Sequence, residues 1–209
     1  MQRPQTMSDA NQVSPFSKRK MNNQDLIDGI VTGSPVAARQ FHQRYSAEIS
    51  QCVWYLIGKD SEHEDIVQQI LANILSNLKT IKKPSSLDSW VKSVVIRTVR
   101  EELRKRKTKH NYFSKSIDVD YNLFPEPSSP WKYAHIRSFY RILDKLPPDD
   151  RIIFILRHLE GMAIEEIAEF GGYSESTAKR RLKRAKSLFL KEAMTDLSLL
   201  SLIMEGHEF

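Results

Sequence analysis

Long stretches without glycine or proline are the feature that most constrains the fold of this chain. They cover residues 59–83, 85–124, 149–160 and 173–205. Within them, apolar residues recur at spacings of three and four, which is the period of one face of an α-helix. Neither the alternating pattern of a half-buried β-strand nor the Asn-Gly turn of a hairpin occurs in the sequence. The sequence therefore predicts an all-α fold.

The helical pattern is interrupted by one long irregular segment, which indicates two small helical domains joined by a flexible linker. We expect a disordered tail over 1–21, a first domain over 22–108, a linker over 109–130, a second domain over 131–195 and an apolar tail over 196–209. Helices are expected near 23–32, 34–57, 60–78, 86–107, 131–145, 148–160, 164–170 and 174–193. Ser34 followed by Pro35 predicts an N-cap and a first helical residue. Either Met7 or Met21 could be the true start of the protein.

The composition argues against several classes of protein. No stretch approaches the roughly 18 apolar residues that a membrane-spanning helix needs, and the polar N-terminus does not read as a secretion signal. A single cysteine, Cys52, cannot form an internal disulfide framework or a multi-cysteine zinc site, which fits a reducing cytoplasm. The six histidines show no paired metal-ligand spacing, and no nucleophile motif or phosphate-binding glycine loop occurs. We therefore expect no metal, no cofactor, no membrane insertion and no enzymatic activity.

The net charge of +6 is concentrated in two segments. Residues 97–109 carry seven basic and two acidic side chains, and residues 179–191 carry seven basic and no acidic side chains. The remainder of the chain then has a net charge of −6. The sequence thus predicts an acidic-to-neutral body with one basic helix in each domain.

On the expected helices these charges gather on one face. In the helix over 86–107, the side opposite the apolar residues carries Ser93, Arg97, Arg100, Arg104 and Lys107. In the last helix, Lys179 with Lys183 and Arg180 with Arg184 are like-charge neighbours four residues apart, each pair costing about 0.2 to 0.5 kcal/mol in a free helix. A merely solvated face usually carries both signs of charge. We therefore favour a polyanionic partner, and nucleic acid is the obvious candidate.

Residues 164–182 have the pattern of a helix-turn-helix. Ala168 is small where two helices must cross closely, Gly172 supports the turn, and Ser174 caps the next helix. Ala178, six residues after Gly172, points back into the hinge. The second helix of this motif can enter the major groove with its N-terminal residues at base edges. The second domain is therefore predicted to bind DNA.

These segments together resemble a known family. Residues 143–151, 156–162 and 179–185 strongly resemble region 4 of extracytoplasmic-function sigma factors of bacterial RNA polymerase, which belong to the sigma-70 superfamily. Residues 64–69, 86–91 and 101–106 resemble region 2 of the same family. The likeness spans about residues 22–193 in the right order. Phe170 and Gly171 stand where the family usually has two aliphatic residues, so the packing of the hinge is expected to differ slightly.

The resemblance implies a promoter-recognition subunit that acts with core RNA polymerase in the cytoplasm, on a stress- or signal-responsive regulon. The implied contacts with the upstream, minus-thirty-five element are Ser176, Thr177, Lys179, Arg180, Lys183 and Arg184. The implied contacts with the opened minus-ten element are Lys79, Lys82, Lys83, Ser86, Arg97, Arg100 and Arg104. The implied polymerase-docking residues are Glu64, Asp65, Gln68 and Gln69. An anti-sigma factor clamped over both domains is the implied antagonist.

Two other interpretations stay open at this point. The chain could be a helix-turn-helix regulator that binds duplex DNA without polymerase, with the first domain used for sensing or dimerisation. A recombinase would need a catalytic tyrosine or serine constellation, which the sequence does not show. The apolar residues 197–204 could pack on their own domain, or meet a regulator or the other domain.

Overall fold

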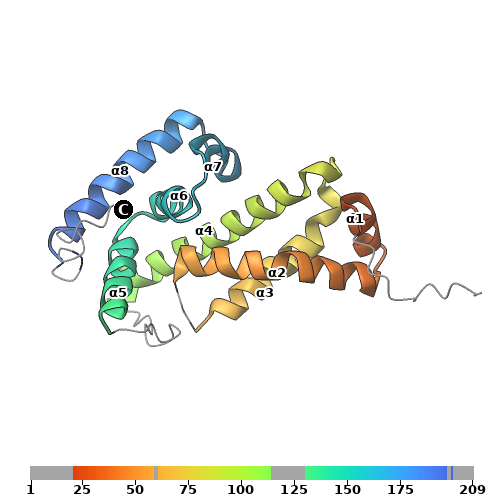
Figure 1. Cartoon of the computed structure of the whole chain (residues 1–209), viewed down its shortest axis with the longest axis horizontal. Helices are drawn as coiled ribbons and strands as arrows, with labels where there is room; N and C mark the ends of the chain where they lie inside the picture. Colours follow the sequence, from red (N-terminus) through yellow and green to blue (C-terminus); the bar gives the residue numbers. More distant parts are fainter. Residues whose placement is uncertain (1–20, 59–60, 114–129, 197–198, 200–209) are drawn as a thin grey trace, which may run out of the picture.

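The computed structural model describes residues 21–58, 61–113, 130–196 and 199 (Figure 1). The helices are α1 (Asn23–Val31), α2 (Pro35–Ile57), α3 (His63–Asn77), α4 (Leu87–Phe113), α5 (Pro130–Lys145), α6 (Pro148–His158), α7 (Ile164–Gly171) and α8 (Glu175–Ala193). Two short 3-10 turns, η1 (Leu78–Thr80) and η2 (Pro84–Ser86), lie between α3 and α4. No strand occurs in these described ranges, and the predicted all-α fold is confirmed.

The local signals at the helix starts act as expected. The side chain of Ser34 accepts a hydrogen bond from the Ala37 amide at 3.4 Å, and Pro35 is the first residue of α2. Asn22 caps α1 in the same way, accepting from the Asp25 amide at 2.8 Å. These caps satisfy amide groups that the first turn of a helix leaves without an internal partner.

Two boundaries differ from the sequence-based expectation. Helix α4 continues to Phe113, past the expected end near residue 107, because residues 85–124 contain neither glycine nor proline to stop it. The segment between the helices expected near 60–78 and 86–107 contains the turns η1 and η2. Residues 114–129 of the expected linker and the N-terminal tail lie outside the described residues.

The first domain is built around α2, which packs against α1, α3 and α4. Its core consists of fully buried side chains from these helices: Phe41, Ile49, Leu56, Ile70, Ile74 and Val99. These residues recur on one face of each helix, as the spacing of three and four requires. The exposed positions are mostly polar, although Val31, Val36 and Leu75 are also exposed.

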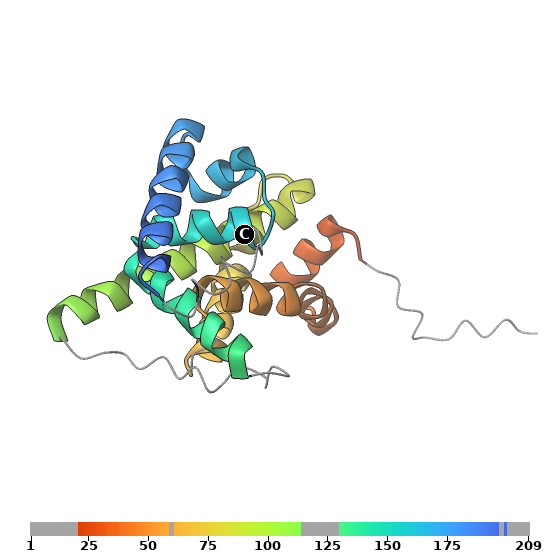
Figure 2. The same ribbon diagram turned by 60° about the vertical axis from the view of Figure 1, so that its left-hand side comes forward.

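In the second domain, α6 is enclosed by its neighbours. It contacts α4, α7 and α8 as well as α2, and every residue from Asp150 to Leu156 is buried. A helix that is buried all round needs neighbours on both sides. Figures 1 and 2 show α4 running between the other helices of the first domain and the second domain, with α6 and α7 against one side of it. The cores of the two domains consequently join into one cluster.

Two residues of the predicted apolar tail, Asp196 and Leu199, fall within the described part of the chain. Leu199 is buried and belongs to the common core. Leu199 of the predicted apolar tail therefore packs against the rest of the protein. The other residues of the segment 197–204 lie outside the described ranges.

Candidate nucleic-acid interface

The hinge of the helix-turn-helix has the predicted construction. Helix α7 ends at Gly171 and is capped by Gly172, whose φ of 67° and ψ of 35° lie in the left-handed region that favours glycine. Ser174 then caps α8, accepting a hydrogen bond from the Thr177 amide at 3.3 Å. Ala168 and Ala178 are both buried between the helices. Small residues are needed there because larger side chains would hold α7 and α8 apart.

Several cationic side chains in the N-terminal half of α8 are exposed to solvent. Ser176, Lys179, Arg180 and Lys183 are exposed, and Thr177 is half-buried. Lys179 forms an ion pair with Glu175 one turn earlier. Among the described residues, no ion pair involves Arg180 or Lys183. Helix α8 thus presents a basic surface beside the hinge, as predicted.

Arg184, also predicted to contact DNA, is engaged inside the domain. Its Nε and Nη2 atoms lie 2.5 and 2.7 Å from the two carboxylate oxygens of Asp150. The side chain of Asp150 is 0% exposed, whereas that of Arg184 is 56% exposed. A carboxylate removed from water needs such a partner. Arg184 therefore serves to neutralise Asp150, a role that its sequence pattern did not reveal.

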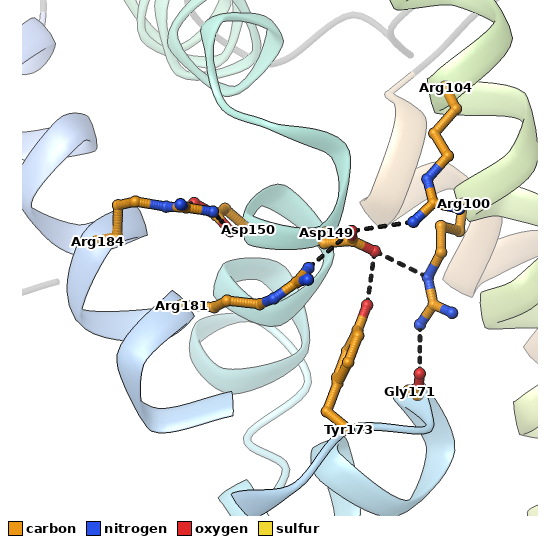
Figure 3. Close-up of polar contacts among 8 residues, drawn as sticks. All are labelled: Arg100, Arg104, Asp149, Asp150, Gly171, Tyr173, Arg181 and Arg184. Atoms are coloured by element: carbon orange, nitrogen blue, oxygen red, sulfur yellow. Dashed lines mark hydrogen bonds and ion pairs between the residues drawn. The ribbon is translucent and has the colours of Figure 1, made fainter. Parts of the chain in front are cut away.

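A second carboxylate, that of Asp149, is the centre of a larger cluster (Figure 3). Oδ1 lies 3.0 Å from Nε of Arg100 and accepts a hydrogen bond from the Tyr173 hydroxyl at 2.6 Å. Oδ2 lies 3.1 Å from Nη2 of Arg104 and 2.7 Å from Nη1 of Arg181. The two arginines of α4 come from the first domain, and the other partners from the second. We call these five residues the Asp149 cluster.

The cluster fixes the charge of its carboxylate. Burial alone raises the pKa of Asp149, but the hydrogen bonds from Tyr173, Arg181 and Arg104 outweigh it and lower the pKa to about 2. Burial and the hydrogen bond to Asp149 raise the pKa of Tyr173 to about 12. Asp149 is consequently anionic and Tyr173 neutral throughout the physiological range.

The ring of Tyr173 lies between cations from both domains. The guanidinium carbons of Arg100 and Arg181 lie 4.9 and 4.7 Å from the ring centroid. A Cβ atom at Gly171 would lie 2.3 Å from Cε2 of this ring, so only glycine fits beneath it. Nη2 of Arg100 also donates to the Gly171 carbonyl at 2.8 Å. Gly171 thus makes room for the ring of Tyr173.

The basic face predicted on α4 is divided by this arrangement. Arg97 is exposed, but the Arg100 side chain is only 15% exposed because it is held by Asp149. The Arg104 side chain is 58% exposed and is paired with the same carboxylate. Lys107 donates to the Leu146 carbonyl at 3.4 Å. Arg100, Arg104 and Lys107 therefore face the second domain.

The other predicted residues are placed on the surface of the first domain. Lys79, Lys82 and Lys83 are exposed on the segment between α3 and α4, and Ser86 is half-buried with its hydroxyl donating to the Lys83 carbonyl at 2.7 Å. The predicted docking residues on α3 are all exposed: Glu64, Asp65, Gln68 and Gln69. The residues between α3 and α4 and the docking residues on α3 lie on other elements than the α8 surface. The predicted site residues therefore form separate patches.

Sequence reasoning did not assign a function to Asp149, Asp150, Arg151, Tyr173 or Arg181. The first three follow Pro147-Pro148 directly and read as an ordinary charged first turn of a helix. One sequence signal could have indicated their importance. Helix α6 has apolar residues on every side, so its charged first turn has no solvated face and its charges need partners within the protein.

Comparison with known proteins gives matches to both domains. Residues 41–109 match the family described as Sigma-70 region 2, and residues 136–188 match Sigma-70, region 4. The RNA polymerase sigma factor SigV of Bacillus subtilis is 33% identical over 126 residues, covering 59% of this chain and 71% of that protein. The ECF RNA polymerase sigma factor EcfG of Rhodopseudomonas palustris is 31% identical over 134 residues, covering 63% and 71%.

Solved structures resemble the fold. A structure of CnrH in complex with the cytosolic domain of CnrY has a TM-score of 0.56 at 18% identity, covering 84% of this chain and 99% of that chain. The sigma factor RpoE in complex with the anti-sigma factor NepR from Bartonella quintana has a TM-score of 0.55 at 20% identity, covering 76% and 97%. At these identities the likeness concerns the arrangement of the helices.

Proposed function

The chain belongs to the extracytoplasmic-function group of the sigma-70 family of RNA polymerase sigma factors, and we propose that it guides core polymerase to promoters through separate surfaces on its two domains. The observation that carries this proposal is the pairing of both family regions, in order, with a basic helix in each. A regulator that used the helix-turn-helix alone would not need region 2. The family is one of transcription initiation factors, and we place the protein in the cytoplasm, where its DNA would lie.

The upstream element would be read by the N-terminal half of α8. Arg180 and Lys183 are exposed beside the hinge, and arginine there can contact a guanine edge or a phosphate. Lys179 is held near the surface by Glu175 and Thr177 lies in the first turn. Ser176, with its hydroxyl 3.1 Å from that of Ser174, completes this surface.

The minus-ten element would be engaged by the first domain. Lys79, Lys82 and Lys83 form an exposed basic edge at the start of α4, and Arg97 continues it along the helix. Such a surface can follow the phosphates of a single strand after the duplex has opened. Opening costs a few kcal/mol per flipped base, which binding to the single strand partly offsets. Arg100 and Arg104 would join this surface.

Polymerase would dock on the exposed polar face of α3. Glu64, Asp65, Gln68 and Gln69 lie on one side of that helix, opposite the buried Ile66 and Ile70. Both solved neighbours named above are bound by a partner, and in one of them RpoE is called a sigma factor and its partner NepR an anti-sigma factor. We propose an antagonist of that kind for this chain.

Among the described residues, no helix has both the length and the apolar character needed to cross a bilayer.

Transcription by reconstituted polymerase tests the proposal. Adding the purified chain to sigma-free core polymerase and a pool of genomic promoter fragments should give transcripts with defined start sites. Replacing Arg180 and Lys183 by Ala should reduce those transcripts, whereas the matched control Lys191→Ala, on the last turn of the same helix, should not. Tight binding to a duplex without any polymerase-dependent transcript would favour the regulator instead.

A further inference from the structure

The C-terminal end of α2 is completed by the second domain. The last carbonyl groups of a helix lack partners within the helix and carry its partial negative charge. Here Nε of Arg151 donates to the Leu56 carbonyl at 2.8 Å, and its Nη2 donates to the Ile57 carbonyl at 2.9 Å. The Tyr140 hydroxyl lies 3.1 and 3.3 Å from the carbonyls of Trp54 and Tyr55. Two side chains of the second domain thus satisfy the end of a first-domain helix.

This contact is buried and closely fitted. The side chain of Arg151 is 3% exposed, and it forms an ion pair with Asp144. A Cβ atom at Gly58 would lie 3.0 Å from Cδ1 of Tyr140, so the ring lies directly on the last turn of α2. An arginine can be this deeply buried only where carbonyl and carboxylate oxygens receive its donors. Arg151 therefore has its full set of partners only when the two domains are in contact.

The Asp149 cluster is a second link between the same domains. It gives Arg100 and Arg104 a carboxylate partner, and phosphate is the other anion that such arginines bind well. An Asp149 carboxylate with a pKa near 2 keeps its charge at any pH at which DNA would compete. Two arginines that the minus-ten surface would use, Arg100 and Arg104, are thus already paired with a carboxylate within the chain.

We propose that the free protein is autoinhibited by these two links, with Asp149 standing in for a DNA phosphate on Arg100 and Arg104. In this closed form the exposed cations of α8 and the edge formed by Lys79, Lys82, Lys83 and Arg97 are available, whereas Arg100 and Arg104 are paired with Asp149. Separation of the domains releases two further arginines to the nucleic acid. The proposal rests on the proposed function, because it assumes that the arginines of α4 contact DNA.

The test opens the closed form without touching a DNA-contacting residue. Arg151→Ala removes the link at α2. Arg157→Ala is the matched control, since Arg157 is an exposed arginine of the same helix whose hydrogen bond within the described ranges goes to the Met162 carbonyl of its own domain. Small-angle scattering of the full chain should show a larger radius of gyration for Arg151→Ala. Fluorescence anisotropy with a labelled duplex of random sequence, without polymerase, should show binding that is tighter by about fivefold or more.

The salt dependence identifies which charges are released. Freeing two arginines should steepen the slope of log K against log salt by about 1.8, or about 0.9 for each phosphate contact. Adding Arg100→Gln and Arg104→Gln to Arg151→Ala should remove this increment. Tyr140→Phe keeps the ring and loses only the hydroxyl, so it should increase the radius of gyration and the DNA affinity by smaller amounts than Arg151→Ala. This variant replaces Arg151→Ala in the test if Arg151→Ala does not fold.

Three results would overturn the proposal. The first is an unchanged radius of gyration in both variants. The second is an expanded protein that binds DNA no better than the wild type, and the third is tighter binding that survives the loss of Arg100 and Arg104. Transcription by the reconstituted polymerase distinguishes failure of this proposal from failure of the proposed function. A wild-type chain that directs transcripts acts as a sigma factor in each of these three cases.

Discussion

Helices α4 and α8 carry similar blocks of positive charge, yet the fold uses them differently. Residues 97–109 and 179–191 each contain seven basic side chains. In the first half of α8, Arg180 and Lys183 are exposed, whereas on α4 the side chain of Arg100 is only 15% exposed and lies against Asp149. A basic stripe in a sequence thus indicates a capacity to bind anions. The packing of neighbouring helices determines which of its cations are exposed to an anionic partner.

The same contrast recurs within α8. Arg180 faces solvent, but Arg181 reaches Asp149 and Arg184 reaches Asp150. Adjacent positions on one helix point about 100° apart, so neighbouring arginines can serve different purposes. Arg181 and Arg184 pair with carboxylates of α6, whereas the exposed Arg180 is the one that we propose contacts DNA.

The largest effect is expected at Arg184. Arg184→Ala would leave the buried Asp150 carboxylate without its cation, and losing one partner of a buried pair typically costs about 3 kcal/mol or more of unfolding free energy. Urea denaturation followed by circular dichroism would measure the loss. Arg180→Ala is the control and should change stability by less than about 0.5 kcal/mol. Equal stabilities for the two variants would contradict the distinction between them.

Acid should act on the Asp149 cluster. The pKa of Asp149 is lowered in the folded protein from 3.8 to about 2, so its stabilising contribution is complete above the unfolded value and is lost as the pH falls toward 2. The shift corresponds to about 2 kcal/mol. The difference in unfolding free energy between wild type and Asp149→Asn should therefore be constant near neutral pH and shrink below about pH 4. A difference that grows on acidification would show that the carboxylate is not held by its cations.

A smaller effect is expected from Tyr173→Phe. The variant keeps the ring between the two guanidinium groups and loses only the hydroxyl that donates to Asp149 at 2.6 Å. A hydrogen bond to a charged group contributes about 1.5 kcal/mol. Thermal unfolding would measure this loss. Tyr55→Phe, which removes a hydroxyl that accepts a hydrogen bond from Gln51 at the surface, is the matched control. If both variants unfold alike, the hydroxyl of Tyr173 contributes nothing specific.

The smallest effect on folding, but a clear effect on DNA, is expected for Arg180→Ala. Losing one phosphate contact should reduce the salt slope of promoter binding by about 0.9 while leaving stability within about 0.5 kcal/mol of the wild type. Binding of the polymerase complex to a promoter duplex at several salt concentrations would give the slope. An unchanged slope would remove Arg180 from the set of phosphate contacts.

Much of the fold could be read from the sequence because its determinants are local. Ser34 and Pro35 specify the start of α2, and Gly172 specifies the end of α7 through its left-handed backbone. The end of α4 could not be located, because nothing in the sequence before Phe113 stops a helix. Which exposed residues contact DNA or polymerase remains a prediction, since the structure shows where they lie and not what they bind.

The sequence by itself determined the all-α class, the helix-turn-helix and the presence of a basic helix in each domain, because helix period, capping and charge are properties of neighbouring residues. Only the tertiary structure decided that Arg100, Arg104, Arg181 and Arg184 find carboxylates on α6, and that Arg151 completes the end of α2. Those contacts join residues that are distant along the chain. Their partners are set by how helices from the two domains pack, which no local pattern records.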